Sequence, residues 1–483
     1  MKNKIFIVLT IVLSISLFLC GCKNNKDKKY NVTLMVDNEQ YQVIEMGNEE
    51  VLDAVTLPAV EKELHNFVGW KDANGNLFTT TMTITSDITL FAEFEALPTV
   101  TLTIIYNDSY TKEYEVLSWE QITLADYIEE IDNYAFSSWE INGSVYSKEF
   151  IILDSDMTIK ALYMKAPKPV YLANDYFKHG KISVSGADLV DQNGEKFQLI
   201  GLSTHGLQWF SRYVNRGTIA AIKNEFGINV IRLAMYTSED GYCTSEANKE
   251  RLYNTVVQGV KYATEVGLYV IIDWHMVGAE DPKDKNPLYY KDEAVDFFSR
   301  ISKEFKDYDN VLYEIMNEPN GNAVKWSHCK EYANLVIPKI RENTDAIILV
   351  GNPNWTANLN AVMADPLEGY ENIMYTYHFY ADSHRNTYQV ETAYNKGFPV
   401  FISEHGGMES SGDGAINYES IQAWYKVLDK YNISYVAWNI SNSKGSASII
   451  KHGDDTLTDF SDEHLKEWGQ WYKKWTRSKA GLK

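Results

Sequence analysis

Cysteine is scarce in this sequence, with four residues among 483, and the four are unevenly placed. Cys20 and Cys22 lie close to the N-terminus, which leaves only Cys243 and Cys329 in the remainder of the chain. Two cysteines that are far apart in sequence do not make the framework of a disulfide-stabilised scaffold. We therefore expect two free thiols.

Positive charge is also in short supply. Lysine and arginine total 45 residues against 66 aspartates and glutamates, which gives a net charge of −21 at pH 7. Because binding to phosphate-rich partners needs clustered Lys and Arg, this balance argues against nucleic acid or an anionic surface as a partner. The hydrophobic and charged fractions, 45% and 23%, are ordinary for a globular protein, and the length allows one large domain plus smaller modules.

The N-terminus lacks a convincing transmembrane span. Lys2 and Lys4 precede the apolar run Ile5–Leu19, which is too short and wrongly flanked to cross a membrane and is typical of a signal segment. It ends in Leu19-Cys20-Gly21-Cys22, which resembles a bacterial lipoprotein processing box. The resemblance implies removal of a signal peptide, residues 1–22, and a cell-surface lipoprotein anchored to the membrane through lipid on Cys22. Cleavage as an ordinary secretory signal, which releases a free extracellular protein, is the alternative.

The chain repeats itself before its large domain. Matching positions in the two copies are 69 residues apart for most pairs and 68 residues apart at an Asn-Gly turn. A one-residue difference within a turn is typical of a duplicated module. The matches are Phe67–Trp70 with Phe136–Trp139, Asn74-Gly75 with Asn142-Gly143, Phe78 with Tyr146, and Thr85–Ala92 with Asp154–Ala161. Short β-like runs with hairpin and Ser-Asp turn signals predict two small β-rich modules, residues 30–96 and 97–166.

These modules resemble the Listeria–Bacteroides type repeats of surface proteins, whose units are β-grasp-like. A polar tether, residues 23–29, precedes them, and a stiff linker, residues 167–179, follows with the sequence Pro167-Lys168-Pro169. Two interpretations stay open. The modules are spacers or adhesion units that contact the cell wall, or they bind glycan through Trp70 and Trp139, two residues that are more often core in tandem copies.

From about residue 180, apolar runs alternate with amphipathic stretches, the pattern of parallel βαβ units. The predicted strands are Gln198–Ser203, Val230–Met235, Tyr269–Trp274, Val311–Met316, Ala346–Val350, Ile373–Phe379, Pro399–Glu404 and Ser434–Asn439. The predicted helices between them include Ala247–Val266, Asp292–Phe305, Ser327–Asn343 and Tyr418–Tyr431. Eight such units predict a (β/α)₈ TIM barrel. A hairpin over Ile182–Phe197, turning at Gln192-Asn193-Gly194, is expected to cover its bottom.

Two predicted strands end in glutamate and are followed at once by turn residues. Val311–Met316 leads into Asn317-Glu318, and Pro399–Glu404 ends in Glu404. Barrel enzymes keep their chemistry at the carboxyl ends of their strands, and two carboxylates offered there are what cleavage of a glycosidic bond requires.

The other predicted strands also carry polar or aromatic residues, or lead to them in the loops that follow. These residues are His205, Trp209, Arg232, Tyr236, Asp273, His275, Trp355, His378, Tyr380 and Trp438. A structural role, as part of an ion pair or as a buried histidine, explains any one of these residues. It does not readily explain why most strands supply such a residue at the same face of the barrel.

Residues 180–477 resemble the endo-β-1,4-glucanases (cellulases) of glycoside hydrolase family 5. The matching segments are His205–Trp209, Ile231–Tyr236, Ile271–His275, Tyr313–Gly321, His378–Ala381, Ser403-Glu404 and Ala437–Asn439. The resemblance implies a retaining, endo-acting hydrolase that cleaves cellulose and related soluble β-glucans by double displacement. It implies no cofactor and no metal, and we expect a monomer.

The resemblance also implies a role for each residue. Glu404 is the expected nucleophile and Glu318 the expected acid/base, with carboxyl groups about 5 Å apart. Around this pair the expected partners are Arg232 and Tyr380 as donors to Glu404, His378 as the neighbour of Glu318, and Asn317 as the contact to the sugar 2-hydroxyl. The expected substrate-binding residues are His205, His275 and Trp438 at the cleavage point, and Trp209, Tyr236 and Trp355 along the cleft.

The sequence departs from the family pattern after the eighth strand. Many members carry Lys five residues beyond the strand-eight Trp, where this chain has Ser443, followed by Lys444. We expect Lys444 to take over the sugar contact through a shifted loop, and substrate preference is therefore less well defined than the chemistry.

Three alternatives remain. A metal-dependent hydrolase could use Asp273 with His205, His275, His378 and His405, although the His-x-His pair usual at strand one of barrel metallohydrolases is missing. A non-catalytic glycan-binding surface protein is expected to have lost one of the two glutamates, and both are present. Within the family, the same chemistry on mixed-linkage glucan, xyloglucan, xylan or mannan stays open.

Overall fold

The structure is a computed structural model that describes residues 28–62, 64–131, 134–146, 150–165, 167–279 and 281–482. The expected signal peptide, Cys22 and most of the tether lie outside these residues. No helix within the described ranges is long and apolar enough to cross a membrane.

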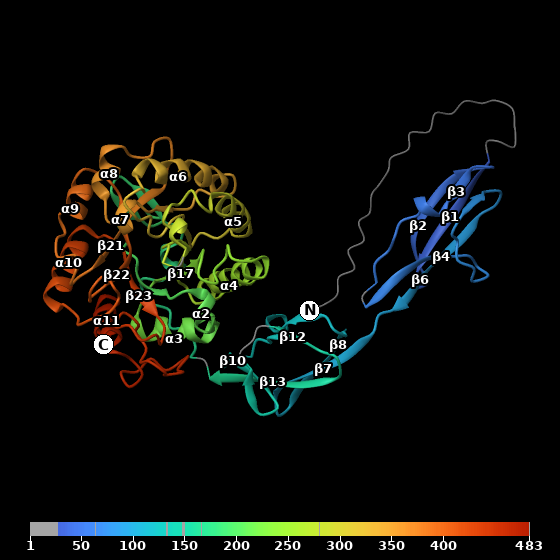
Figure 1. The fold of residues 1–483 in the computed structure, drawn as a ribbon, viewed down its shortest axis with the longest axis horizontal. Coiled ribbons are helices and arrows are strands. Elements are labelled where there is room, and N and C mark those ends of the chain that lie inside the picture. The colour runs from blue at the N-terminus through green and yellow to red at the C-terminus, as the bar shows by residue number, and fades with distance from the viewer. Residues whose placement is uncertain are drawn as a thin grey trace. The chain divides into compact units, whose positions relative to one another are not determined.

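The large domain is a closed barrel of eight parallel strands surrounded by helices, which confirms the predicted TIM barrel (Figure 1). The strands, in the order in which they pair, are β16 (Ile200–Thr204), β17 (Val230–Tyr236), β18 (Tyr269–His275), β19 (Val311–Glu314), β20 (Ile348–Val350), β21 (Ile373–Tyr380), β22 (Val400–Gly406) and β23 (Tyr435–Ile440). The fourth strand ends at Glu314, two residues earlier than its apolar run predicts.

The helices form the outer layer. They are α2 (Leu207–Phe210), α3 (Arg216–Phe226), α4 (Glu246–Glu265), α5 (Lys291–Glu304), α6 (Trp326–Arg341), α7 (Pro353–Thr356), α8 (Leu359–Ala364), α9 (Tyr388–Asn395), α10 (Tyr418–Tyr431) and α11 (Glu467–Lys479). Their ends follow local chemistry. Asn215, Ser245 and Asn417 cap α3, α4 and α10 by accepting backbone N–H bonds in the first turn.

The barrel interior is filled by apolar side chains at its amino-terminal end. Alternate residues of the strands point inward, and those near the strand starts form one buried cluster that includes Val230, Tyr269, Ile271, Leu312, Leu349, Met374, Phe401 and Val436. Ile182, Leu189 and Phe197 from the preceding segment join this cluster, so the segment closes the bottom of the barrel as expected.

The turn of that hairpin lies elsewhere than predicted. The paired strands are β14 (Ser183–Ser185) and β15 (Asp188–Val190), so the chain reverses at Gly186, whose φ is +61°. Gln192-Asn193-Gly194 form a second turn instead, closed by a bridge between Val190 and Lys196. The Asn-Gly signal does mark a turn, but a shorter glycine turn precedes it.

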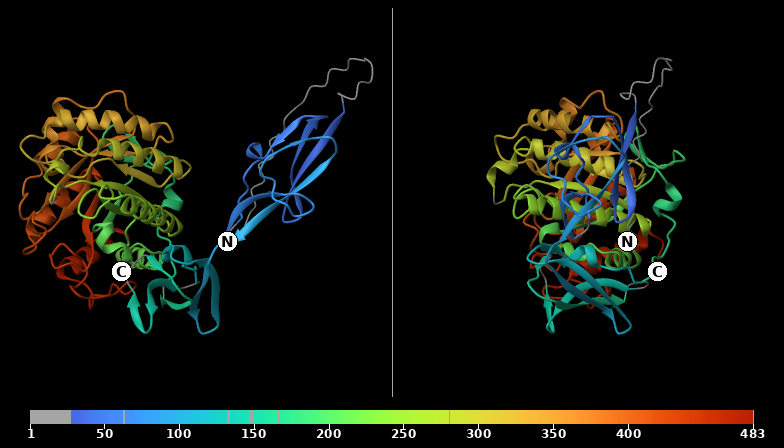
Figure 2. Two further views of the ribbon diagram at one scale, coloured as in Figure 1. Left: turned by 45° about the vertical axis from the view of Figure 1, so that its right-hand side comes forward. Right: turned by 90° about the vertical axis from the view of Figure 1, so that its right-hand side faces the viewer.

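Each repeat forms a β sheet of its own (Figure 2). The two sheets have corresponding strand orders. The first pairs β2 (Glu39–Gly47), β1 (Lys29–Val36), β6 (Ile88–Ala96) and β4 (His65–Lys71). The second pairs β8 (Tyr110–Leu117), β7 (Thr99–Asn107), β13 (Met157–Lys165), β10 (Tyr134–Ile141) and β11 (Ser144–Tyr146). Short pairs complete them: β3 (Val51–Asp53) with β5 (Thr81–Thr83), and β9 (Gln121–Thr123) with β12 (Phe150–Ile152).

The repeated Ser-Asp motif has the same function in both modules. Asp87 accepts a bond of 2.8 Å from the backbone N–H of Asn31, and Asp156 accepts one of 2.7 Å from that of Thr101. Trp70 and Trp139 are 3% and 4% exposed, so both are core residues and neither offers a face to a glycan.

Part of the segment expected to be a linker is bound to the barrel. Lys223 on α3 donates to the carbonyl of Val170 at 2.8 Å and to the carboxylate of Asp175 at 2.7 Å, and Asn224 donates to the carbonyl of Lys168 at 2.8 Å. Residues 168–175 are therefore fixed to the barrel surface.

Candidate active site

Arg232 stands at the centre of the barrel's carboxyl-terminal half. It occupies the inward position two residues beyond the apolar bottom layer, and its side chain is fully buried. Nε donates to Glu314 at 2.6 Å, Nη2 lies 3.0 Å from Asp273, and Nη1 donates to Glu404 at 3.1 Å. Burial opposes the charge, but the three carboxylates outweigh it and raise the pKa of Arg232. One cation thus organises three acidic side chains from three strands.

Glu404 is held at both oxygens. Arg232 donates to Oε2 at 3.1 Å, and the hydroxyl of Tyr380 donates to Oε1 at 2.7 Å. Burial and the Glu404 charge raise the pKa of Tyr380 well above its usual value, so this phenol stays a donor. These are the two donors that the sequence suggested, and together they fix the orientation of the Glu404 carboxyl group.

Glu318 pairs with His378. The Nδ1 atom of His378 lies 2.9 Å from Oε1 of Glu318, and its Nε2 lies 2.9 Å from the hydroxyl of Ser403. Burial lowers the pKa of His378, but the Glu314 carboxylate 3.8 Å away, the hydrogen bond to Glu318 and the nearby Glu404 charge raise it to about 9. The raised pKa favours the protonated ring, in which Nδ1 donates to the ionised form of Glu318.

The other two histidines at the strand ends are neutral. Burial, reinforced by Arg232, lowers the pKa of His275 to about 3, and its Nδ1 donates to Asp273 at 2.6 Å. Burial also lowers the pKa of His205 to about 4, and its Nδ1 accepts from the backbone of Gly206 at 2.7 Å. The Nε2 atom of His205 therefore carries the ring proton and is a hydrogen-bond donor.

Aromatic rings surround these histidines. The Trp438 indole lies 5.2 Å from the His275 ring at 11°, and 5.1 Å from the His205 ring. Tyr236 stacks on His275 at 4.2 Å and lies 5.1 Å from Trp209. Trp209 and Trp355 remain 44% and 50% exposed, which leaves their faces available for a pyranose ring, whereas Trp438 and Tyr236 are largely buried.

Asn317 joins the two halves of the site. Its Oδ1 accepts from Nη2 of Arg232 at 2.7 Å, and its Nδ2 donates to the carbonyl of Met276 at 3.2 Å and lies 3.3 Å from Nε2 of His275. The amide orientation is thereby fixed beside Glu318.

His405, considered as a metal ligand, does not enter the site. Its Nδ1 lies 2.7 Å from the carbonyl of Val436 and its Nε2 lies 2.7 Å from the hydroxyl of Tyr425 on α10, so the ring faces the helix layer. Burial lowers the pKa of His405 to about 3, and the ring is a neutral core group.

The loop after β23 contains the sequence departure. Lys444 is exposed, and the carbonyls of Ser443, Lys444 and Gly445 accept bonds of 2.6, 3.1 and 2.7 Å from Nζ of Lys466. The ammonium group of Lys466 therefore fixes the shape of this loop, and Lys466 was not among the residues predicted from the sequence.

Three residues that support the site had no role in the mechanism expected from the sequence. Glu314 and Asp273 hold Arg232, and Ser403 holds His378. Burial raises the pKa of Asp273, and Arg232 opposes that rise, whereas Arg232 and His378 overcome the burial of Glu314 and lower its pKa to about 2. One feature of the sequence could have identified Glu314 as a site residue. It lies two residues after the inward-facing Leu312 in an otherwise apolar strand, so its carboxylate also points into the barrel.

Among the described residues, one group of three or more potential metal ligands comes together: Glu318, His378 and Glu404, with ligand atoms that all lie within 4.8 Å of one another. The same atoms already bind one another, Arg232 and Tyr380, so a cation there competes with these bonds. The distance also places a carboxylate oxygen of Glu318 within 4.8 Å of one of Glu404.

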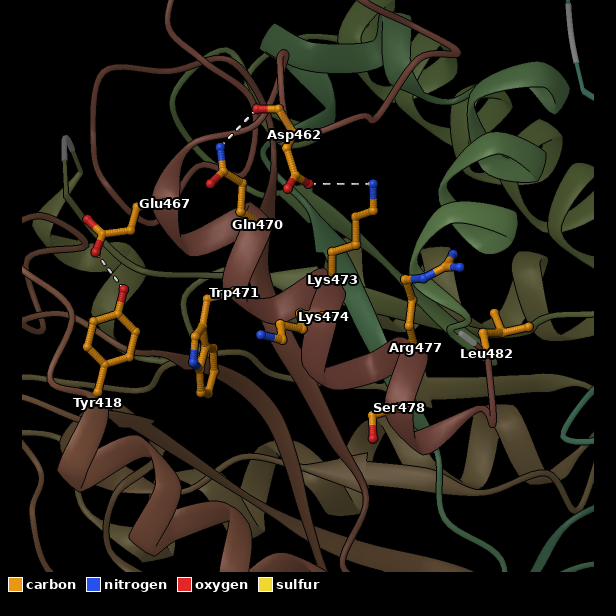
Figure 3. Close-up of a pocket in the computed structure, with 10 residues that line it drawn as sticks. All are labelled: Tyr418, Asp462, Glu467, Gln470, Trp471, Lys473, Lys474, Arg477, Ser478 and Leu482. Carbon is orange, nitrogen blue, oxygen red and sulfur yellow. Dashed lines mark hydrogen bonds and ion pairs between the residues drawn. The ribbon is translucent and has the colours of Figure 1, made fainter.

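A separate groove of about 680 Å³ runs along α11 and is lined by Trp471, Lys474 and Tyr418, among other residues (Figure 3). Its polar groups are largely engaged with one another: Tyr418 donates to Glu467 at 2.5 Å, and Gln470 donates to the carbonyl of Asp462 at 2.8 Å. None of the site residues described above lines this groove.

Comparison with known proteins shows which sequences and structures this chain resembles. The family model described as Cellulase (glycosyl hydrolase family 5) matches residues 190–444. Endoglucanase A of Butyrivibrio fibrisolvens is 44% identical over 298 residues, which are 61% of this chain and 68% of that protein. An Endoglucanase of Clostridium saccharobutylicum is 37% identical over 298 residues, 61% of this chain and 64% of that protein.

Solved structures agree. The catalytic domain of the Thermobifida fusca endoglucanase Cel5A, in complex with cellotetraose, superimposes with a TM-score of 0.58 at 35% identity. The match covers 62% of this chain and 99% of that one. The curated relatives extend beyond what this chain shares with them, since it spans about two thirds of their length.

Proposed function

We propose that this chain, which belongs to glycosyl hydrolase family 5, is an endo-β-1,4-glucanase that cleaves internal bonds of cellulose and related soluble β-glucans with retention of configuration. The observation that carries the proposal is the pair Glu318 and Glu404. Their carboxylate oxygens approach within 4.8 Å, the short separation of retaining rather than inverting enzymes, at the carboxyl end of a TIM barrel.

In the first step, Glu404 attacks the anomeric carbon of the sugar on the non-reducing side of the cleaved bond. The bond from that carbon to the leaving oxygen breaks, and Glu318 gives its proton to this oxygen. A covalent glycosyl ester of Glu404 remains. Arg232 and Tyr380 hold the two oxygens of Glu404 beforehand, so the nucleophile does not reorganise as it reacts.

In the second step, Glu318, now ionised, takes a proton from water as the water oxygen attacks the anomeric carbon. The ester bond breaks, Glu404 regains its charge and Glu318 regains its proton. His378, whose Nδ1 lies 2.9 Å from Glu318, stabilises the carboxylate that forms in the first step.

Asn317, His205 and His275 are the proposed polar contacts to the sugar at the cleavage point. Arg232 and Met276 orient the Asn317 amide toward the 2-hydroxyl, a contact that strengthens in the oxocarbenium-like transition state. Trp438 forms the platform there, and the exposed faces of Trp209 and Trp355 extend the cleft for further glucose units.

The test is reducing-sugar release from a panel of soluble β-glycans by the wild type, Glu318→Gln and Glu404→Gln. Both substitutions are expected to abolish activity on carboxymethyl cellulose, while Glu409→Gln, at an exposed residue beyond the same strand, retains it. A rapid fall in viscosity establishes endo action, and the β-anomer as first product establishes retention. If the wild type releases no reducing sugar from any glycan of the panel, the proposal is wrong.

The same panel decides the preferred glycan. Mixed-linkage glucan, xyloglucan, xylan and mannan are the alternatives, because the loop at Ser443 and Lys444 departs from the family pattern. Activity that survives metal chelation separates this mechanism from a metal-dependent one.

We also propose that the enzyme acts at the cell surface, tethered through Cys22, with the two β modules as spacers between anchor and barrel. The lipoprotein-like Leu19–Cys22 segment supports this, and the burial of Trp70 and Trp139 favours the spacer interpretation. Cys22→Ala is expected to move the protein from the membrane fraction to the medium or to block its processing.

A further inference from the structure

The segment that carries Glu318 is irregular, yet its backbone is fully bonded. Strand β19 ends at Glu314, so Asn317–Asn320 lie beyond the regular pairing of β19 with its neighbours. Instead the N–H groups of Asn317, Glu318 and Asn320 donate to the carbonyls of Trp274, Met276 and Lys285 at 3.1, 3.2 and 3.0 Å. The carbonyl of Glu318 accepts from the side chain of Asn320 at 2.8 Å.

The carbonyls on either side of Glu318 are held by one short turn. The hydroxyl of Thr356 donates to the carbonyl of Asn317 at 2.5 Å, and the N–H of Trp355 donates to the carbonyl of Pro319 at 3.1 Å. Thr356 and Asn317 are both buried, so water cannot replace the hydroxyl as a donor.

That turn has a conformation that side chains normally avoid. Asn354, Trp355 and Thr356, within α7, have φ values of +66°, +54° and +54°. The ψ values of 53° and 46° at Asn354 and Trp355 complete the geometry of a left-handed helical turn. Every residue but glycine meets a steric cost there, and Thr and Trp are poorly suited to it.

Strain of this kind persists where the surroundings over-determine it, typically at functional sites. Here the left-handed turn orients the Thr356 hydroxyl, the Trp355 N–H and the Trp355 indole. The Thr356 hydroxyl and the Trp355 N–H bind the two sides of the Glu318 peptide, while the Trp355 indole stays half exposed for substrate.

We infer that Thr356 is a positioning residue for the acid/base Glu318, acting through the carbonyl of Asn317, and that the left-handed turn Asn354–Thr356 exists to place it. The inference rests on the proposed function and deepens it. Without the hydroxyl, the Asn317–Pro319 peptides lose one of the two bonds that this turn supplies, and Glu318 rotates away from the leaving oxygen. Proton donation suffers, while the nucleophile Glu404, held from other strands, does not.

The test compares two substrates whose need for a proton differs. Cellotetraose has a sugar leaving group that requires protonation, whereas dinitrophenyl cellobioside has a leaving group that departs without it. Thr356→Val keeps the β-branched shape and therefore the same backbone strain, but removes the hydroxyl. It is expected to lower kcat/KM on cellotetraose by about ten- to a hundredfold, with a much smaller effect on the aryl glycoside. Thr356→Ser restores the hydroxyl and is expected to behave as the wild type on both.

The ratio of the two kcat/KM values distinguishes positioning from general loss of structure. An equal loss on both substrates, no loss on either, or Thr356→Ser as impaired as Thr356→Val overturns the inference. Should Thr356→Val fail to fold, Thr356→Ala against Thr356→Ser gives the same comparison. Inactivity of the wild type on both substrates refutes the proposed function instead.

Discussion

Arg232 and Glu314 face each other inside the barrel, with Nε 2.6 Å from Oε2 and neither side chain exposed. Glu314→Gln keeps the shape but removes a charge from beneath a buried guanidinium. We expect it to lower the free energy of unfolding by about 3 kcal/mol, and to lower kcat because Arg232 then shifts toward its remaining acidic partners.

The matched control for this prediction is an exposed pair. Arg300 lies 3.1 Å from Glu250 with both side chains partly in solvent. Glu250→Gln is expected to cost less than about 1 kcal/mol and to leave kcat unchanged. Chemical denaturation gives the free energy of unfolding of both variants, and initial rates give their kcat. Equal losses of stability in the two variants contradict the prediction that the buried pair contributes more than the exposed one.

Tyr380→Phe removes one of the two donors to Glu404. Because the phenol holds the oxygen that Arg232 does not reach, we expect kcat on carboxymethyl cellulose to fall by about a hundredfold with little change in melting temperature. Tyr377→Phe is the control, since Tyr377 lies on the same strand but packs against Trp424 on the outer face. A fall in kcat for both variants contradicts a specific role of the Tyr380 hydroxyl.

The regular parts of the barrel could be predicted because they follow periodicity. All eight strands lie within a few residues of their predicted positions, and α10 coincides with the predicted Tyr418–Tyr431. The strand-end residues could be named because a polar group at the end of a buried apolar run is costly unless it has a partner or a ligand. The hairpin turn was misplaced because two glycine-containing turns, at Gly186 and Gly194, compete within a few residues.

What periodicity could not give is the direction of side chains where it breaks. Strict alternation from Phe401 turns His405 inward and Glu404 outward. The pairing register of β22 with β23 shifts between Ile402 and His405, and this irregularity turns Glu404 to Arg232 and His405 to Tyr425. Glu314 was missed because the apolar run continues past it to Met316, which places the predicted strand end two residues too late, and because it acts through Arg232.

Asp284 is a buried carboxyl group outside the catalytic pair, and it gives a pH-dependent prediction. Its Oδ2 accepts from the hydroxyls of Thr237 and Ser238 at 2.7 and 2.8 Å, and burial raises its pKa from 3.8 to about 7. The folded state holds the proton more tightly than the unfolded chain, so the stability it contributes is present at acid pH. That stability is lost as pH rises through about 7.

Asp284→Asn stays neutral at every pH and keeps an acceptor for the two hydroxyls. We expect its free energy of unfolding to exceed that of the wild type at pH 8 by about 1 kcal/mol or more, and this margin to shrink at pH 5. Asp292→Asn on the exposed side of α5 is the control and is expected to show no such trend. A margin that is the same at both pH values is incompatible with a buried titrating carboxyl group.

Lys466 holds the loop after β23 through the carbonyls of Ser443, Lys444 and Gly445, at 2.6, 3.1 and 2.7 Å. The loop lies where family members supply a lysine contact to a sugar, so its shape is expected to affect binding rather than bond cleavage. Lys466→Met retains the length but not the donors, and we expect KM for cellotetraose to rise with kcat nearly unchanged. Lys474→Met, on the exposed side of α11, is the matched control.

Lys444→Ala then separates two contributions to binding. A rise in KM equal to that of Lys466→Met assigns the sugar contact to the Lys444 ammonium, which the loop holds in place. An unchanged KM in Lys444→Ala with a raised one in Lys466→Met assigns it to the loop backbone, and an unchanged KM in both variants removes this loop from the binding cleft.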